Sequence, residues 1–339
     1  MNKTWLIYAL GGGWGHLTRA LSLGRIAAKY RKVRVITNSP YAQQVSNEGC
    51  LIDWIPDDAG FSATCIKVRE ILLSIDYDCL IVDTFPRGLG GELADILPQL
   101  HSIPRILIHR DINPQYIIAK NLRDFVAANF DLVIVPGEGT DLGLCDLPTV
   151  QYTAPWLIRN AEELPERDTT RSPEAGLCPS LILRVDKFVK IILVCAAGTA
   201  SELDIFSQLA LRLHEAFPEC AVRILAANCP VNCPESLWIS HHPGIECLAA
   251  ADVVVGGGGY NTVYECAAVG VPLVALAFPR LYDRQEKRAS KSYYVQNIEQ
   301  AIATVRILLN PVKTAKKQSA SAYINGAVQA VHQIMSYKL

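Results

Sequence analysis

Short apolar runs alternate with stretches of helical periodicity through the first 158 residues of the chain. Apolar runs that are rich in β-branched residues and bounded by turn signals are typical of buried strands. The strands predicted in this way are 5–10, 33–37, 51–55, 79–82, 105–109 and 132–135. Because strands that alternate with helices form βαβ units, this part of the chain is predicted to build a parallel sheet.

The helix after the first strand has a clear apolar face. Leu17, Leu21, Gly24 and Ala28 recur at helical spacing, and the basic residues, Arg19 among them, are expected on the other faces. A predicted loop, 11–16, precedes this helix and joins it to the strand.

A second α/β region follows a change in character. Residues 159–187 contain charges, three prolines and little periodicity, and are predicted to be a linker or a crossing between domains. Further strands are predicted at 191–195, 222–226, 237–240, 253–255 and 273–278. The predicted organisation is a Rossmann-like domain over 1–158, the linker, a second Rossmann-like domain over 188–310, and a helical tail over 311–339. Two such domains are expected to enclose a ligand cleft between them, because ligands bind beyond the carboxyl ends of parallel strands.

Composition removes several classes of function. The formal charge of −1 argues against a generic nucleic-acid binder, and no apolar stretch reaches the ~18 residues of a membrane span. The chain begins on a strand without a recognisable signal segment, and eleven cysteines then indicate reduced thiols. The expected location is cytoplasmic, with membrane contact peripheral at most. Cys229, Cys233, His241 and His242 do not have the spacing of a common zinc site, so no metal is predicted.

The strongest chemical signal is the run from Val253 to Glu265. Three valines end a strand, and four glycines, 256–259, then let the backbone turn and approach a ligand closely. Asn261 and Thr262 favour a helix start, and 264–269 is predicted to be helical and to end at Gly270. Such a helix start suits a phosphate group, and Glu265, one turn further on, is placed to accept hydrogen bonds from ribose hydroxyls.

The N-terminal loop Gly11-Gly12-Gly13-Trp14-Gly15-His16 also joins a strand to a helix. It lacks the G-x-G-x-x-G spacing, and no acidic residue ends the next strand, so NAD binding is disfavoured. His16 would lie in the first turn of the helix, where the dipole disfavours its protonated form and leaves a neutral base. The alternative is a histidine that only caps the turn.

Three further segments are candidate ligand contacts. The segment Asp283-Arg284-Gln285 lies between Arg280 and Lys291, a stretch with five basic and two acidic residues that suits a diphosphate. The alternative is a solvated helix start with Asp283 as its N-cap. Gly198 and Thr199 form another possible anion site at a helix start. His109, Arg110 and Asp111 end a strand of the first half, where they would bind an acceptor or brace a loop.

These motifs together resemble the GT-B glycosyltransferases of the MurG type, which transfer N-acetylglucosamine from UDP to a lipid-linked acceptor. The resemblance is carried by the loop 11–16, by the run 252–265, and by Phe278-Pro279-Arg280-Leu281-Tyr282-Asp283-Arg284-Gln285. It covers most of the chain, and its C-terminal half is the specific part. Its N-terminal half departs from the family at Trp14 and at 109–113.

The resemblance implies roles for individual residues. On the donor side it places Glu265 at the ribose, and the sugar is read by Gln285 with Asp283. The basic residues near Arg284 are expected to add to the positive field at the diphosphate. The resemblance further implies that the diphosphate is met by Gly198, Thr199, Gly258, Gly259, Asn261 and Thr262, and that 239–245, from Ile239 to Ile245, flanks the uracil. His16 matches the proposed base. The acceptor side is expected to comprise Gly12, Gly13, Trp14, Gly15, His109, Arg110 and Asp111.

The sequence therefore predicts a metal-independent, inverting glycosyltransferase with a UDP-sugar as co-substrate and no bound cofactor. Two other interpretations stay open. A non-catalytic nucleotide-sugar-binding subunit would explain Trp14, and a UDP-sugar epimerase shares the two-domain plan but requires further acid–base carboxylates.

Overall fold

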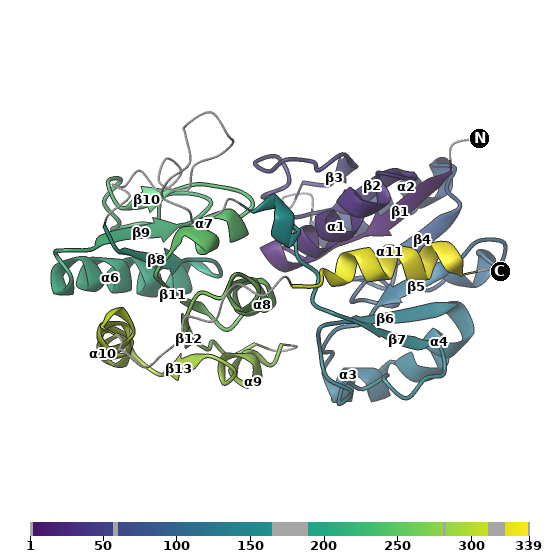
Figure 1. The fold of residues 1–339 in the computed structure, drawn as a ribbon. Helices are drawn as coiled ribbons and strands as arrows, with labels where there is room; N and C mark the ends of the chain where they lie inside the picture. Colours follow the sequence, from purple (N-terminus) through teal and green to yellow (C-terminus); the bar gives the residue numbers. More distant parts are fainter. Residues whose placement is uncertain (1–2, 57–59, 165–188, 281–282, 311–322, 338–339) are drawn as a thin grey trace. The chain divides into compact units, whose positions relative to one another are not determined.

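The structure, a computed structural model, describes residues 3–56, 60–164, 189–280, 283–310 and 323–337. Its contacts divide the chain into two compact units (Figure 1). The first comprises Met1–Ile158, Leu281–Asp283 and Ile324–Leu339, and the second comprises Arg159–Arg280 and Arg284–Tyr323. Most of the predicted linker, 165–187, and part of the predicted tail, 311–322 and 338–339, lie outside the described residues.

The first unit is built on a seven-stranded parallel sheet with the order β3-β2-β1-β4-β5-β6-β7. The strands are β1 (Thr4–Tyr8), β2 (Lys32–Thr37), β3 (Leu51–Trp54), β4 (Cys79–Asp83), β5 (Arg105–Ile108), β6 (Leu132–Pro136) and β7 (Val150–Thr153). Every residue of β4 and β5 is buried, as expected for central strands of a parallel sheet covered on both faces.

The helices of this unit are α1 (Trp14–Ala27), α2 (Phe61–Ser74), α3 (Pro114–Ala119), α4 (Leu122–Asn129) and the short helix η2 (Leu97–Gln99). The last helix of the chain, α11 (Gly326–Ser336), also belongs here and packs beside α1 (Figure 1). Asn325 begins α11 and is hydrogen-bonded to both the N–H and the carbonyl of Leu157. The end of the chain is thereby tied to the end of the main segment of the first unit.

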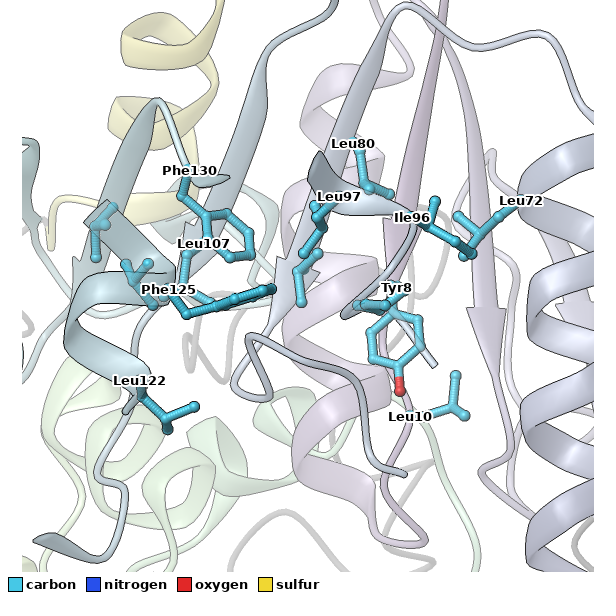
Figure 2. Close-up of a cluster of buried hydrophobic side chains, with 14 of the residues drawn as sticks. Tyr8, Leu10, Leu72, Leu80, Ile96, Leu97, Leu107, Leu122, Phe125 and Phe130 are labelled. Carbon is cyan, nitrogen blue, oxygen red and sulfur yellow. The ribbon is translucent and has the colours of Figure 1, made fainter. Parts of the chain in front are cut away.

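A large apolar cluster lies between one face of this sheet and the helices that pack on it (Figure 2). Tyr8, Leu80 and Leu107 come from the central strands, and Leu72 and Phe125 come from helices that pack over them. Fully burying a side chain of this size contributes about 1.5–3 kcal/mol, so the cluster stabilises the frame on which the strand ends are held.

The second unit has a six-stranded parallel sheet with the order β10-β9-β8-β11-β12-β13. Its strands are β8 (Ile191–Cys195), β9 (Ala221–Leu225), β10 (Trp238–Ile239), β11 (Val253–Gly257), β12 (Leu273–Leu276) and β13 (Tyr293–Val295). Its helices are α6 (Ala200–Ala216), α7 (Ile245–Ala250), α8 (Tyr260–Val269), α9 (Gln285–Ala289), α10 (Ile298–Leu309) and the short η3 (Ala161–Glu163).

Both sheets reverse their strand order at one point. In the first sheet β2 lies on one side of β1 and β4 lies on the other, and in the second β9 and β11 flank β8 in the same way. The loops that leave such neighbouring strands diverge at the carboxyl edge, and the crevice between them is where ligands bind in α/β sheets. The predicted glycine loops, 11–16 and 256–259, both lie at such a point.

The prediction of two parallel α/β sheets is confirmed, and the differences are local. The prediction did not include β7 and β13, which lie at the sheet edges. The predicted helix 264–269 begins earlier, at Tyr260, with Gly259 as its N-cap, so Asn261 and Thr262 lie in its first turn. Gly270 ends it in the left-handed conformation at φ 70°, as predicted. The N-cap of α9 is Arg284 rather than Asp283.

Candidate functional site

A histidine and an aspartate meet at the reversal point of the first sheet. His16 lies in the first turn of α1, which follows β1, and Asp83 is the last residue of the neighbouring strand β4. The His16 Nδ1 atom lies 2.6 Å from Asp83 Oδ2. The Asp83 side chain is fully buried, whereas that of His16 is 19% exposed.

Arg19 completes this cluster. Its Nε and Nη2 atoms donate to the two Asp83 oxygens at 3.1 and 2.8 Å. Burial raises the pKa of Asp83, but the charges of Arg19 and His16 and their hydrogen bonds outweigh it, and the net pKa lies well below the usual range. Asp83 is therefore a buried carboxylate that stays ionised.

The contacts of Asp83 also fix the imidazole of His16. Because a carboxylate only accepts hydrogen bonds, a neutral His16 carries its proton on Nδ1 and leaves the lone pair on Nε2. The longer contact of 3.4 Å between Arg19 Nη2 and Nδ1 arises because both groups bond the same carboxylate. Phe85 stacks on the ring with centroids 5.5 Å apart. The arrangement suits proton abstraction by a held base.

Two backbone positions beside the cluster are unusual. Thr84, directly after Asp83, has a φ of 71°, which is rare for a β-branched residue. Gly11 has a φ of 144°, and a Cβ there would lie within 2.5 Å of His16 Nε2. Gly11 adopts this conformation without strain because it has no Cβ, whereas Thr84 is strained. Strained backbone often clusters at functional sites, and Thr84 adjoins the hydrogen-bonded pair.

The other loop residues predicted on the acceptor side surround the start of α1. A Cβ at Gly12 or Gly13 would meet nothing within 4 Å, so space is open there, whereas one at Gly15 would lie 3.3 Å from Arg19 Nη1. Trp14 stacks face to face on Tyr41, with ring centroids 4.1 Å apart and planes 7° apart. The bulky Trp14 is thus packed along the loop after β2.

The segment after β5 is more buried than the sequence suggests. His109 is fully buried, and neither of its ring nitrogens has a hydrogen-bond partner among the described residues. Burial and the neighbouring charge of Arg110 lower the pKa of His109 to about 4. Arg110 is also buried and lies 3.2 Å from Glu138, while Asp111 is partly exposed. The predicted acceptor role of these three residues stays a prediction.

The reversal point of the second sheet holds the start of α8. Gly259 is the N-cap, no side chain caps the helix, and its first turn contains no acidic residue. A Cβ at Gly259 would meet nothing within 4 Å, whereas one at Gly258 would lie 2.7 Å from the Gln285 carbonyl oxygen. Gly258 is therefore needed for packing, and Gly259 leaves room beside a positive helix end.

Glu265 lies one turn further along α8 and is buried. Its carboxylate has no hydrogen-bond or ion-pair partner within the described ranges, and burial raises its pKa to about 8. Cys195, at the end of β8, lies nearby. Burial is the main cause that raises the pKa of its thiol, and the charge of Glu265 raises it further. The carboxylate therefore lies near the reversal point with its hydrogen-bonding capacity unused.

The start of α6, the other helix at this point, is closed by the chain itself. Thr199 is the N-cap, and its N–H donates to Glu202 Oε2 at 2.9 Å. Arg280 binds Glu202 through both of its terminal nitrogens. Gly198 has a φ of 136°, and a Cβ there would collide with the Glu202 carboxylate. At the predicted anion site of Gly198 and Thr199, the Glu202 carboxylate therefore already accepts the Thr199 N–H.

The remaining donor-side candidates occupy different settings. Gln285 is buried and its Oε1 accepts the N–H of Phe278 at 3.1 Å, while Arg284 is partly exposed at the start of α9. Asp283 is grouped by its contacts with the first unit. Ile239 in β10 and Ile245 in α7 are buried core residues.

Acidic and metal-ligating residues do not gather at these points. The triplet Asp76-Tyr77-Asp78, a pattern that suits a divalent cation, precedes β4 and so lies at the opposite edge of the sheet from His16. His241 bonds Glu246 at 2.7 Å instead of joining Cys229 and Cys233. Among the residues that the structure describes, no group of three or more histidines, cysteines or acids is placed to hold a metal. None of the described helices is both long and apolar enough to span a membrane.

Four residues that shape these points were not among the predicted site residues: Arg19, Asp83, Glu202 and Arg280. Arg19 was expected on a polar face of α1 but is buried, because its guanidinium is the partner of Asp83. One signal was available for Asp83. It is the single charge at the end of an otherwise apolar strand, and the usual strand order places that end beside the first glycine loop.

Comparison with solved structures identifies the fold. The chain is 14% identical to the glycosyltransferase of kitacinnamycin, with a TM-score of 0.61 and 99% of each chain covered. The spinosyn rhamnosyltransferase SpnG, complexed with thymidine diphosphate, is 13% identical with a TM-score of 0.57, over 98% of this chain and 95% of that one. A UDP-N-acetylglucosamine 2-epimerase is 14% identical with a TM-score of 0.58, over 99% and 95%.

No protein-family model and no curated protein sequence matches the chain. At the identities found, the structural likeness shows the fold alone. The protein thus has the GT-B fold of two Rossmann-like domains, as the sequence predicts.

Proposed function

We propose that this protein is an inverting glycosyltransferase that moves a sugar from a UDP-sugar to an acceptor hydroxyl. The sugar is N-acetylglucosamine or a related hexose, as in the MurG-type enzymes that the motifs resemble. The acceptor is unidentified, and lipid-linked acceptors belong to the class that this resemblance suggests. No divalent metal and no cofactor takes part in the proposed reaction.

The observation that carries the proposal is the hydrogen bond between His16 and Asp83 at the carboxyl edge of the first sheet. Sugar transfer to a hydroxyl needs a base that removes the hydroxyl proton as the oxygen attacks. His16 supplies Nε2 for this purpose, and Asp83 holds the ring and stabilises the imidazolium that forms. The lowered pKa of Asp83 keeps this partner ionised throughout.

The donor is assigned to the carboxyl edge of the second sheet. The start of α8 offers N–H groups and a positive helix end to the diphosphate, and Glu265 offers a buried acceptor to the ribose hydroxyls. The neighbouring structure with bound thymidine diphosphate supports a nucleoside diphosphate as the ligand class. The identification of uridine comes from the motif resemblance.

In the proposed step, the acceptor oxygen forms a bond to the anomeric carbon as its proton passes to His16 Nε2. The bond from that carbon to the diphosphate oxygen breaks on the opposite face, which inverts the configuration. The departing diphosphate gains negative charge, and the N–H groups at the start of α8 stabilise it. Removing one pre-aimed donor of this kind typically costs about 3–4 kcal/mol of transition-state stabilisation.

An epimerase is the second candidate, because a UDP-N-acetylglucosamine 2-epimerase is among the similar structures. Such an enzyme would convert the donor without any acceptor. It needs additional acid–base carboxylates at the sugar, and Glu265, Asp83 and Glu202 are each accounted for in other ways. A nucleotide-sugar-binding protein without turnover is the third candidate.

The test starts with thermal shifts for UDP, thymidine diphosphate and their sugar conjugates, which identify the donor independently of the acceptor. The best donor is then incubated with the wild type, His16→Ala and Glu265→Gln, with and without a panel of acceptors, and the products are followed by mass spectrometry and NMR. His101→Ala, at an exposed histidine, serves as the matched control.

The proposal predicts a transferred or slowly hydrolysed sugar that depends on His16, and weaker donor binding in Glu265→Gln. Accumulation of an epimer without acceptor would establish the epimerase instead. Donor binding with no product over the whole panel would establish the binding protein. Unchanged turnover in His16→Ala would remove this residue from the role of base.

A further inference from the structure

A pair of cysteines lies in the loop between β9 and β10, outside the proposed chemistry. Cys229 and Cys233 are both partly exposed, whereas Cys50, Cys79, Cys220, Cys247 and Cys266 are buried. Burial is the first cause that raises the pKa of the Cys233 thiol, and the neighbouring Cys229 adds to it through its charge and through a hydrogen bond between the two side chains. The two thiols thus lie near each other, as the 3.4 Å contact of Cys229 Sγ with the Cys233 carbonyl oxygen also shows.

The backbone of the loop holds the pair together. The Cys233 N–H donates to the Pro230 carbonyl at 3.1 Å, which closes a turn, and Asn232, its third residue, has a positive φ of 65°. The Cys229 Sγ atom lies 3.4 Å from the Cys233 carbonyl oxygen. Ser207 of α6 further donates to the Val231 carbonyl at the tip of the loop.

The start of this loop is tied to β10 and to the residue that follows β10. Trp238 Nε1 donates to the Ala226 carbonyl at 3.1 Å, and Ser240 Oγ donates to the Ala227 carbonyl at 3.2 Å. A covalent link between Cys229 and Cys233 would therefore restrict a loop whose base is bonded to β10.

We infer that Cys229 and Cys233 form a thiol–disulfide site, which closes to an intraloop disulfide and thereby restrains the backbone from 226 to 240. The oxidant class is a low-molecular-weight disulfide such as oxidised glutathione. One protein thiolate attacks it and releases one glutathione, and the second thiolate then attacks the mixed disulfide and releases the other. Two protein thiols lose two protons and two electrons, and the oxidant is reduced to two glutathione thiols.

The sequence permits a direct measurement. Combined cleavage after Arg223 and after Glu235 releases residues 224–235, which contain no cysteine except this pair. The full chain is equilibrated with reduced and oxidised glutathione, alkylated, cleaved and analysed by mass spectrometry. The disulfide form escapes alkylation and is lighter than the unalkylated dithiol peptide by about 2 Da, the mass of two hydrogen atoms, whereas the dithiol form gains two alkyl groups.

We expect the fraction of disulfide peptide to change in a single transition. Its position should depend on the square of the reduced glutathione concentration divided by the oxidised glutathione concentration, which is the dependence of an intramolecular disulfide. In Cys229→Ser and Cys233→Ser the remaining thiol should instead retain one glutathione, because no second thiol resolves it. Cys145→Ser and Cys178→Ser are the controls and should leave the transition unchanged, Cys145 being partly exposed elsewhere and Cys178 lying outside the described residues.

Hydrogen exchange tests the structural consequence. Amides in 226–240 should exchange more slowly after oxidation, and those of the central turns of α6 should not change. Full alkylation of both thiols at every glutathione ratio, or two glutathiones on one peptide, would overturn the disulfide. A disulfide without slower exchange in 226–240 would overturn the restraint. Neither readout depends on the proposed sugar transfer.

Discussion

Asp83 and Glu265 are both carboxylates at the reversal point of a parallel sheet, but their environments are opposite. Asp83 is fully buried and is bonded by Arg19 and His16, and its pKa lies below the usual range. Glu265 is buried without a partner among the described side chains, and its pKa rises to about 8. Burial alone disfavours the charged form, and nearby cations and donors reverse that effect.

The difference indicates what each edge still requires. At the first edge both oxygens of the Asp83 carboxylate already have hydrogen-bond partners in the protein, Arg19 and His16. The group of this cluster that is left to act is His16 Nε2, which can accept a proton. The second edge holds a buried acceptor, Glu265, to which none of the residues that the structure describes donates a hydrogen bond. Because buried polar groups are usually satisfied, such a group is expected where a ligand supplies the missing donors.

Removing the imidazole that Asp83 orients should have the largest effect. His16→Ala is expected to lower turnover of the donor by about 10²–10⁴-fold, because general base catalysis typically contributes that much. Donor affinity should change little. Steady-state kinetics with the donor identified by thermal shift, and with His101→Ala as control, measures both. A large loss of donor affinity with unchanged turnover would assign His16 to binding instead.

A matched pair of amide substitutions tests the comparison itself. Asp83→Asn leaves the buried Arg19 guanidinium without its counter-charge and should lower the free energy of unfolding by about 3–5 kcal/mol. Glu265→Gln removes a charge that has no partner and should leave the stability unchanged or raise it near pH 8. Denaturant unfolding of both variants gives the answer, and equal losses in the two would show that the carboxylates are equivalent.

Adjacent glycines at the start of α8 separate packing from ligand approach. Gly258→Ala places a methyl group against the Gln285 backbone and should lower the free energy of unfolding by about 1–3 kcal/mol. Gly259→Ala meets open space at an ordinary φ of −66° and should fold normally. It should nevertheless weaken donor binding if the diphosphate approaches here. Thermal melting with and without donor distinguishes the two effects.

The smallest effect is a slope of stability with pH. The folded pKa of Glu265, about 8, lies above its ordinary value of 4.5, so the folded protein binds more protons than the unfolded chain between these values. Its contribution to stability is therefore present below about pH 4.5 and is lost as the pH rises toward 8. The slope is at most about 1.4 kcal/mol per pH unit and should be absent in Glu265→Gln.

For Asp83 the sign is opposite, because its folded pKa is lowered. Its contribution is present above the ordinary carboxyl pKa and is lost as the pH falls below it. Unfolding curves of Asp83→Asn at pH 3 to 8 should therefore differ from the wild type most at neutral pH. A wild type without either slope would contradict the assigned environments.

Most of the fold could be predicted because central parallel strands are apolar runs. The strands β4, β6 and β8 are read directly from CLIV, LVIV and IILVC. The edge strands β7 and β13 were not predicted, since their sequences, VQYT and YYV, are short and half exposed. They become strands because each pairs with a neighbouring strand, β6 or β12, and their own sequences do not reveal this pairing.

The strand–loop–helix structure of 253–269 could be predicted since it is local: strand, glycines, helix and Glu265 follow one another in the chain. The partner of His16 could not, because Asp83 is 67 residues away and meets it only through the strand order. The same reason explains Arg280, which reaches Glu202 from 78 residues away. Propensity and periodicity carry no information on such pairs.

The most direct test of the central claim is the proton balance of UDP binding. Isothermal titration at pH 7 in buffers of different ionisation enthalpy measures it, with Glu265→Gln to subtract the titration of UDP itself. If ribose hydroxyls donate to the Glu265 carboxylate, its pKa falls on binding, and the wild type should release up to about 0.9 proton more than the variant. Binding with the same proton balance in both proteins would contradict the assignment of the donor to this carboxylate.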